Sequence, residues 1–252
     1  MGRPTDASER ASIEAKRTTD LLAPSMWGTW AFLGGCLSAL PLGIGAQHLA
    51  RLVGMWLLAD VSLGCVMGWW QAWGKQPAAS GGKVTALSAA ALALALSSLL
   101  GKDVLAVTAG GLLLSALIVI ANVNRLGRVN SWLVALHVMQ SWWLGSLALM
   151  PWRSLPVGLG LLVAVGTWAR LELTSAQGIS CRWLISACWL VLGTLPAFYT
   201  QPIVAAMVAV AALVDVYLFL PLGGLCPARQ STAHMAWLLG TLAVGLGSGF
   251  VG

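Results

Sequence analysis

Long apolar stretches dominate the chain, and only short polar or charged clusters interrupt them. The stretches run for roughly 17 to 25 residues, the length that an α-helix needs to cross about 30 Å of hydrocarbon. Because lipid offers the backbone no hydrogen-bond partner, and because the runs are continuous rather than alternating, we expect helices and not a β-barrel to span the membrane. Composition agrees, since 58% of the 252 residues are hydrophobic and 9% are charged, too few polar groups to coat a water-soluble domain.

The predicted fold class is an all-α, polytopic transmembrane helix bundle with about nine spans. The connections are short, so neighbouring helices should pack antiparallel. Residues 26–252 are expected to form a single transmembrane helical domain, and residues 1–25 a cytoplasmic polar tail that is disordered. The predicted spans cover residues 26–46, 52–73, 84–100, 104–122, 131–150, 155–170, 183–199, 203–222 and 232–251.

The distribution of cations predicts the orientation of the bundle. With a cytoplasmic N-terminus, 11 of the 14 Lys and Arg residues fall on the cytoplasmic side, ten in the tail or the predicted loops and Arg170 at the cytoplasmic end of a span, as the positive-inside rule requires. We therefore expect the N-terminus in the cytoplasm and the C-terminus outside. The net charge of +6 is then explained by topology and by attraction to anionic lipid, so the lipid bilayer is the expected partner and nucleic acid is not.

Tryptophans mark the predicted cytoplasmic ends of several spans. Trp27 and Trp30 open the first span around Gly28, and further tryptophans fall at the same level on other helices. Amphipathic rings prefer the headgroup depth, so the pattern predicts an aromatic belt. A cage for a ligand or pigment is the alternative.

Ionisable residues inside the predicted spans are the candidates for function, because each is costly in hydrocarbon. Asp60 is an intramembrane acid near the middle of the second span, whereas Asp215 and His137 are expected at similar depth on the cytoplasmic side. We expect a polar chamber open to the cytoplasm. The alternative is that Asp215 and Glu172 pair with a nearby Arg or His and only orient helices. The candidate ligand-binding residues are Asn122, Asn124, Arg125, Arg128, Asn130, His137, Arg170, Glu172 and Asp215.

The sequence disfavours several sharper functions. Lysine is missing from the predicted spans, which excludes a Schiff-base site for retinal, and the three histidines lie on different elements without the spacing of a metal site. A single histidine holding a haem or chlorin is a remaining alternative. No catalytic residue, metal or cofactor is predicted, and a binding or transport protein is favoured over an enzyme.

Short motifs across most of the chain resemble the YwiC-like membrane proteins. The stretch "PSMWGTWAFL" is similar to the family's opening run, "WWQAWGKQP" to the end of its second helix, and "IANVNRLGRVNSW" to its asparagine and arginine turn. Trp27 stands where the family usually has histidine, and Ala233 or His234 where it has glutamate. The matching positions are Pro24, Gly28, Trp30, Ala31, Asn122, Arg128 and Asn130.

The resemblance implies a multi-pass protein of the bacterial inner (cytoplasmic) membrane. The best hypothesis is a protein that binds or transports a small anionic or amphipathic ligand through a cytoplasm-facing polar cavity. One alternative is an accessory or assembly subunit that packs against other subunits of a respiratory or photosynthetic membrane complex. Another is a divergent transferase similar to the UbiA-type prenyltransferases, but their aspartate-rich motifs are missing from this sequence.

Overall fold

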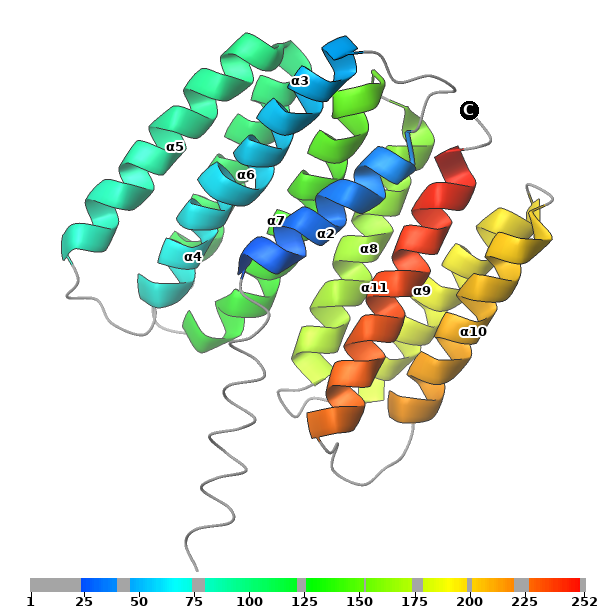
Figure 1. The fold of residues 1–252 in the computed structure, drawn as a ribbon. Helices are drawn as coiled ribbons and strands as arrows, with labels where there is room; N and C mark the ends of the chain where they lie inside the picture. Colours follow the sequence, from blue (N-terminus) through cyan, green and yellow to red (C-terminus); the bar gives the residue numbers. More distant parts are fainter. Residues whose placement is uncertain are drawn as a thin grey trace, which may run out of the picture.

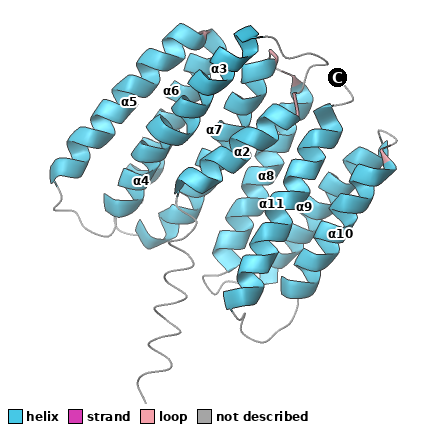
Figure 2. Ribbon diagram, in the orientation of Figure 1, coloured by secondary structure: helices cyan, strands magenta, loops and turns pink. Residues whose placement is uncertain are grey.

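The structure, a computed structural model, describes residues 24–39, 46–73, 80–121, 126–151, 153–173, 179–198, 201–219 and 227–249. These residues form nine helical segments and no strand (Figures 1 and 2), and each segment overlaps one of the predicted spans. The predicted tail lies outside the described residues up to position 23. The helices are α2 (Pro24–Leu37), α3 (Ala46–Trp56) continuing through η1 (Leu57–Ser62) into α4 (Leu63–Trp73), α5 (Ser80–Leu100), α6 (Lys102–Ala121), α7 (Leu126–Leu149), α8 (Ser154–Leu173), α9 (Ile179–Phe198), α10 (Pro202–Phe219) and α11 (Pro227–Gly249).

Among the described residues, three helical stretches are long and apolar enough to cross a membrane. They are His48–Trp70, Lys102–Ala121 and Leu155–Glu172. Four shorter apolar stretches accompany them, at Val84–Leu100, Trp183–Thr194, Pro202–Asp215 and Met235–Ser248. Together with the composition, these helices are typical of a membrane protein.

Helix α7 lies at the centre of the bundle. It packs against α2, α3, η1, α4, α6 and α8, and in Figure 1 helices α3 to α6 lie on one side of it and α8 to α11 on the other. The buried apolar residues divide in the same way. One cluster joins α2 and α7 to α3, η1, α5 and α6, and a second joins α2 and α7 to α8, α9, α10 and α11.

Glycines allow α2 to cross α7 with their backbones in contact. A Cβ atom at Gly35 would lie 1.9 Å from the carbonyl oxygen of Trp142, and one at Gly145 would lie 2.1 Å from the carbonyl oxygen of Phe32. No side chain fits at such distances, so the two glycines determine how closely the helices approach. This close crossing places the start of α2 against the middle of α7, where His137 lies.

The second helical segment runs from Ala46 to Trp73 and contains a π-helical turn at Leu57–Ser62. It begins six residues before the predicted start at 52, because His48 and Arg51 reduce the hydropathy without preventing a helix. In the π segment the N–H of Leu63 donates to the carbonyl of Leu58, five residues back. Such widened turns are rare in proteins, and those that occur are often found at functional sites. Asp60 lies within this turn.

Candidate functional site

Two buried polar centres lie on opposite sides of α7. The first, which we call the arginine centre, consists of Arg170 on α8 and Asp215 on α10. The Nη2 group of Arg170 donates to Oδ2 of Asp215 in an ion pair, and both side chains are 0% exposed. The carboxylate therefore neutralises the guanidinium inside the apolar bundle, where either charge without the other would be costly.

Two tryptophans complete the arginine centre. Trp189 on α9 donates its indole N–H to the same Oδ2 atom of Asp215. The guanidinium carbon of Arg170 lies 4.6 Å from the centroid of the Trp237 ring on α11, within the range of a cation–π interaction. Trp237 in turn donates to Oγ1 of Thr167 over 3.3 Å. One charge pair thus connects the four helices α8 to α11.

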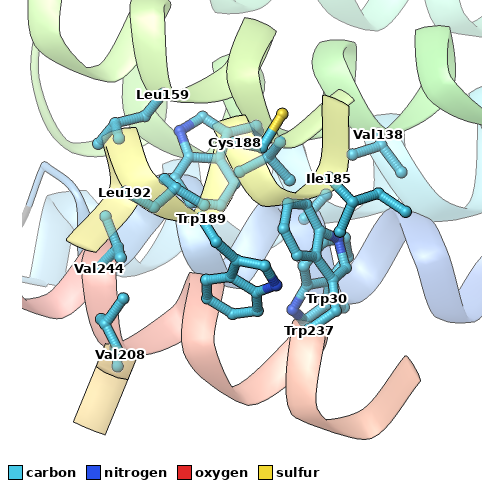
Figure 3. Packing of buried hydrophobic residues seen from close by; sticks show 14 of the residues in the cluster. Trp30, Val138, Leu159, Ile185, Cys188, Trp189, Leu192, Val208, Trp237 and Val244 are labelled. Atoms are coloured by element: carbon cyan, nitrogen blue, oxygen red, sulfur yellow. The ribbon is translucent and has the colours of Figure 1, made fainter. Parts of the chain in front are cut away.

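The rings around this centre belong to the second apolar cluster. Figure 3 shows Trp189 and Trp237 beside Trp30, among aliphatic side chains. The Trp189 and Trp237 rings meet edge to face, with centroids 5.0 Å apart, and Trp30 donates its indole N–H to the carbonyl of Leu238 over 3.1 Å. Trp30 and Trp27 are 7% and 5% exposed, so neither ring faces the outside of the bundle, while the headgroup depth predicted for both stays a prediction. Both rings pack inside the bundle.

The second centre, the histidine centre, lies where α2, η1 and α7 meet. A Cβ atom at Gly28 would be 2.6 Å from Nε2 of His137 and 3.1 Å from Oδ1 of Asp60. The imidazole and the carboxylate therefore converge on one point, and that point is free because residue 28 has no side chain. His137 is 1% exposed, and Oδ1 of Asp60 is buried without a hydrogen-bond partner among the described residues.

A row of polar side chains extends from the histidine centre along α7. Asn130, His137 and Ser141 follow one another after seven and four residues, so they share one face of the helix, with Gln140 beside them. We call these four residues the polar face of α7. Nε2 of Gln140 donates to the carbonyl of Val107 on α6 over 3.2 Å.

Several oxygens of this region are buried without a hydrogen-bond partner in the described part of the chain. They are Oδ1 of Asn130, Oε1 of Gln140, Oγ of Ser141 and, on the adjacent α6, Oγ1 of Thr108. Buried polar atoms are nearly always satisfied, so a group of unsatisfied ones on one helix face makes it a candidate site for a bound ligand, ion or water.

The other candidate residues are distributed around this face. Glu172 on α8 accepts a hydrogen bond from the hydroxyl of Ser131 on α7. Arg128 lies in the first turn of α7, but its side chain is outside the described part. Asn122, Asn124 and Arg125 also lie outside the described residues.

The structure thus places Asp215 with Arg170 and Trp189, and His137 with Asp60 and Gly28. Sequence reasoning missed Trp189, Trp237 and Gly28 as components of the two centres. Both tryptophans lie well inside their apolar stretches, where the indole N–H needs a protein partner. This need for a partner is the sequence signal that could have linked them to a buried polar group.

Neither a protein-family model, nor a curated protein, nor a solved structure matches the chain. Similarity to known proteins therefore assigns no family, and the functional conclusion depends on the geometry of the two centres.

Proposed function

We propose that this protein is a nine-span protein of the bacterial inner membrane, related to the YwiC-like family, with a cytoplasmic N-terminus and an external C-terminus. It binds or transports a small anionic or amphipathic ligand at a site reached from the cytoplasm. The nine helical segments and the concentration of cations in the predicted inner loops support this arrangement.

The polar face of α7 is the observation that carries the proposal. From Asn130 to Ser141 it extends about 16 Å along the helix, at 1.5 Å per residue, which is about half of the hydrocarbon thickness. In the proposed orientation it starts near the cytoplasmic surface and ends near the middle of the membrane. Its unsatisfied amide oxygens accept hydrogen bonds from a ligand that enters from that side, and the hydroxyl of Ser141 can also donate one.

The two arginine groups have different roles in this proposal. Arg125 and Arg128 precede the polar face in the sequence and attract the anionic part of the ligand from the cytoplasmic surface. Arg170 is already neutralised by Asp215. It therefore fixes the positions of α8 and α10, which keeps the bundle rigid around the site.

Native mass spectrometry of the full chain, purified in a mild detergent, tests the proposal. We expect an anionic or amphipathic molecule to remain bound to the wild type. Gln140→Leu removes polarity from the site with little change of volume, and its occupancy should fall at least tenfold. Ser146→Ala is the matched control, because the Ser146 hydroxyl only bonds the carbonyl of Trp143 on its own helix. Equal occupancy in Gln140→Leu and the wild type, or a wild type that retains no such molecule, would contradict the proposal.

A further inference from the structure

We propose that Asp60 and His137 form a proton-binding site at the centre of the bundle, and that proton binding there controls the ligand site on the polar face of α7. The second half of this statement rests on the proposed function. The proton site itself stands on the geometry around Gly28 and is tested separately.

The first observation is the convergence of the two side chains. Nε2 of His137 and Oδ1 of Asp60 approach the same point in the space above Gly28. A proton on the imidazole is stabilised by the adjacent carboxylate. When the proton leaves, the neutral imidazole and the carboxylate remain, so the site changes its net charge by one. Chains of Asp, Glu and His inside membranes are the usual proton relays of pumps and transporters.

The second observation is the backbone that carries Asp60. A π-helical turn interrupts the long helix at the position of this acid, about midway along the apolar stretch His48–Trp70. A π turn shifts the direction of the side chains that follow it and weakens the regular hydrogen-bond ladder. The carboxylate is therefore held on the least regular part of this helix, and this part packs against both α2 and α7.

The third observation concerns the other titratable groups described on the helices that pack against α7. Each of them is exposed, bonded to another side chain, located near a helix end or part of the apolar core. Arg51 and Cys65, on the same helix as Asp60, are exposed, as is Lys102 on α6, while Cys36 on α2 lies in the apolar cluster. On α8, Arg170 pairs with Asp215 and Glu172 accepts from Ser131. His48 lies in the first turn of α3, 12 residues before Asp60. Asp103 lies in the first turn of α6, 8 residues before Gly111, the α6 residue that faces Gln140. Asp60 is thus the acid placed beside His137.

A proton fits these two side chains better than a metal ion. Protein metal sites use three or four side-chain ligands, and the described residues contain no group of three or more His, Cys, Asp or Glu that could hold one. One imidazole and one carboxylate are sufficient to bind and release a proton near neutral pH.

The polar face of α7 connects the proton site to the ligand site. His137 is itself a member of this face, and Gln140 and Ser141 follow it after three and four residues, one helical turn away. A change in the charge of His137 therefore alters the field at the ligand site directly. Binding of an anion is favoured when the proton is bound, because the site then carries one more positive charge.

Histidine ¹⁵N NMR of the full chain in lipid nanodiscs, recorded between pH 5 and 8, tests the proton site without any ligand. The signal of His137 is assigned by its loss in His137→Gln, and we expect it to change charge within this range in the wild type. Asp60→Asn should move the pH midpoint by at least about one unit, a tenfold change in proton affinity. Asp103→Asn, at the start of α6, is the matched control and should leave the midpoint unchanged.

Two results would overturn the proton site. One is a His137 that keeps the same charge state over the whole range in the wild type, where the fold is unperturbed. The other is an equal midpoint in the wild type, Asp60→Asn and Asp103→Asn. Gly28→Ala provides an independent test, because its methyl group displaces the imidazole from the carboxylate. In this background the pH midpoint of His137 should no longer respond to Asp60→Asn. Failure of these tests leaves the ligand occupancies from mass spectrometry intact, so the two proposals fail separately.

Discussion

The arginine centre and the histidine centre bury ionisable groups in the same bundle by different means. At the arginine centre, opposite charges pair directly and two tryptophans surround them, so the helices α8 to α11 are joined through one network. At the histidine centre, a glycine and a π turn leave space between an acid and an imidazole. Although Oδ1 of Asp215 also has no hydrogen-bond partner among the described residues, opposite charges in direct contact hold the helices together. The space beside Gly28, which an acid and an imidazole share, is suited to binding and release. Substitutions in the two centres should therefore have different consequences.

The largest effect is expected from Arg170→Leu. Removing the guanidinium leaves Asp215 as an uncompensated charge with 0% exposure. Loss of one partner from a buried ion pair typically costs about 3–5 kcal/mol, so the free energy of unfolding should fall by about this amount. Unfolding in mixed micelles, followed by circular dichroism, measures it. Arg153→Leu is the control, because Arg153 is exposed.

The double variant Arg170→Leu with Asp215→Leu sharpens this result. Removing both charges leaves no unpaired ion, so most of the lost stability should return. A single variant as stable as Arg153→Leu, or a double variant less stable than the single one, would mean that the ion pair does not hold the helices as described.

A smaller loss of stability is expected when one methyl group is added beside the tryptophan ring that covers Arg170. A Cβ atom at Gly166 would lie 2.2 Å from the Trp237 ring, which covers Arg170. Gly166→Ala should therefore displace the ring and lower the free energy of unfolding by about 1–3 kcal/mol, the usual cost of overpacking. Gly158→Ala on the same helix is the control, since its methyl group would meet no atom within 4 Å. Equal stability of the two variants would show that the ring moves without cost.

The helices could be predicted from the sequence because apolar length is a local property. Each described helix overlaps a predicted span, and the misplaced start of the second one reflects His48 and Arg51, which lower the hydropathy but are compatible with a helix. The inward packing of Trp27 and Trp30 was not predicted, because hydropathy gives the depth of a residue in the membrane and not the direction it faces.

The same limit applies to the polar centres. The sequence identified Asp60, His137 and Asp215 as costly residues and Arg170 as a candidate ligand-binding residue. It left open whether Asp215 pairs with an arginine or shares a chamber with His137. Residues 170 and 215 are 45 positions apart, so their pairing depends on which helices become neighbours. Gly28 illustrates the point further, because its importance comes from two side chains on other helices and leaves no trace in its own sequence pattern.

The smallest effect on stability is expected from Asp60→Asn, and this substitution separates the two centres most directly. Oδ1 of Asp60 receives no hydrogen bond from the described residues. An amide has the same shape as a carboxylate, so the substitution removes a partly buried charge and breaks no hydrogen bond described for that oxygen. At pH 8, where His137 is expected to be neutral, the free energy of unfolding should change by less than about 1 kcal/mol in the same micelle titration, while the pH midpoint of His137 shifts. Groups placed for function often cost stability, so a small gain fits the same interpretation. Asp103→Asn should alter neither quantity. A loss as large as that of Arg170→Leu would contradict the distinction, because it would make Asp60 a second structural ion, as important to the stability of the bundle as Asp215.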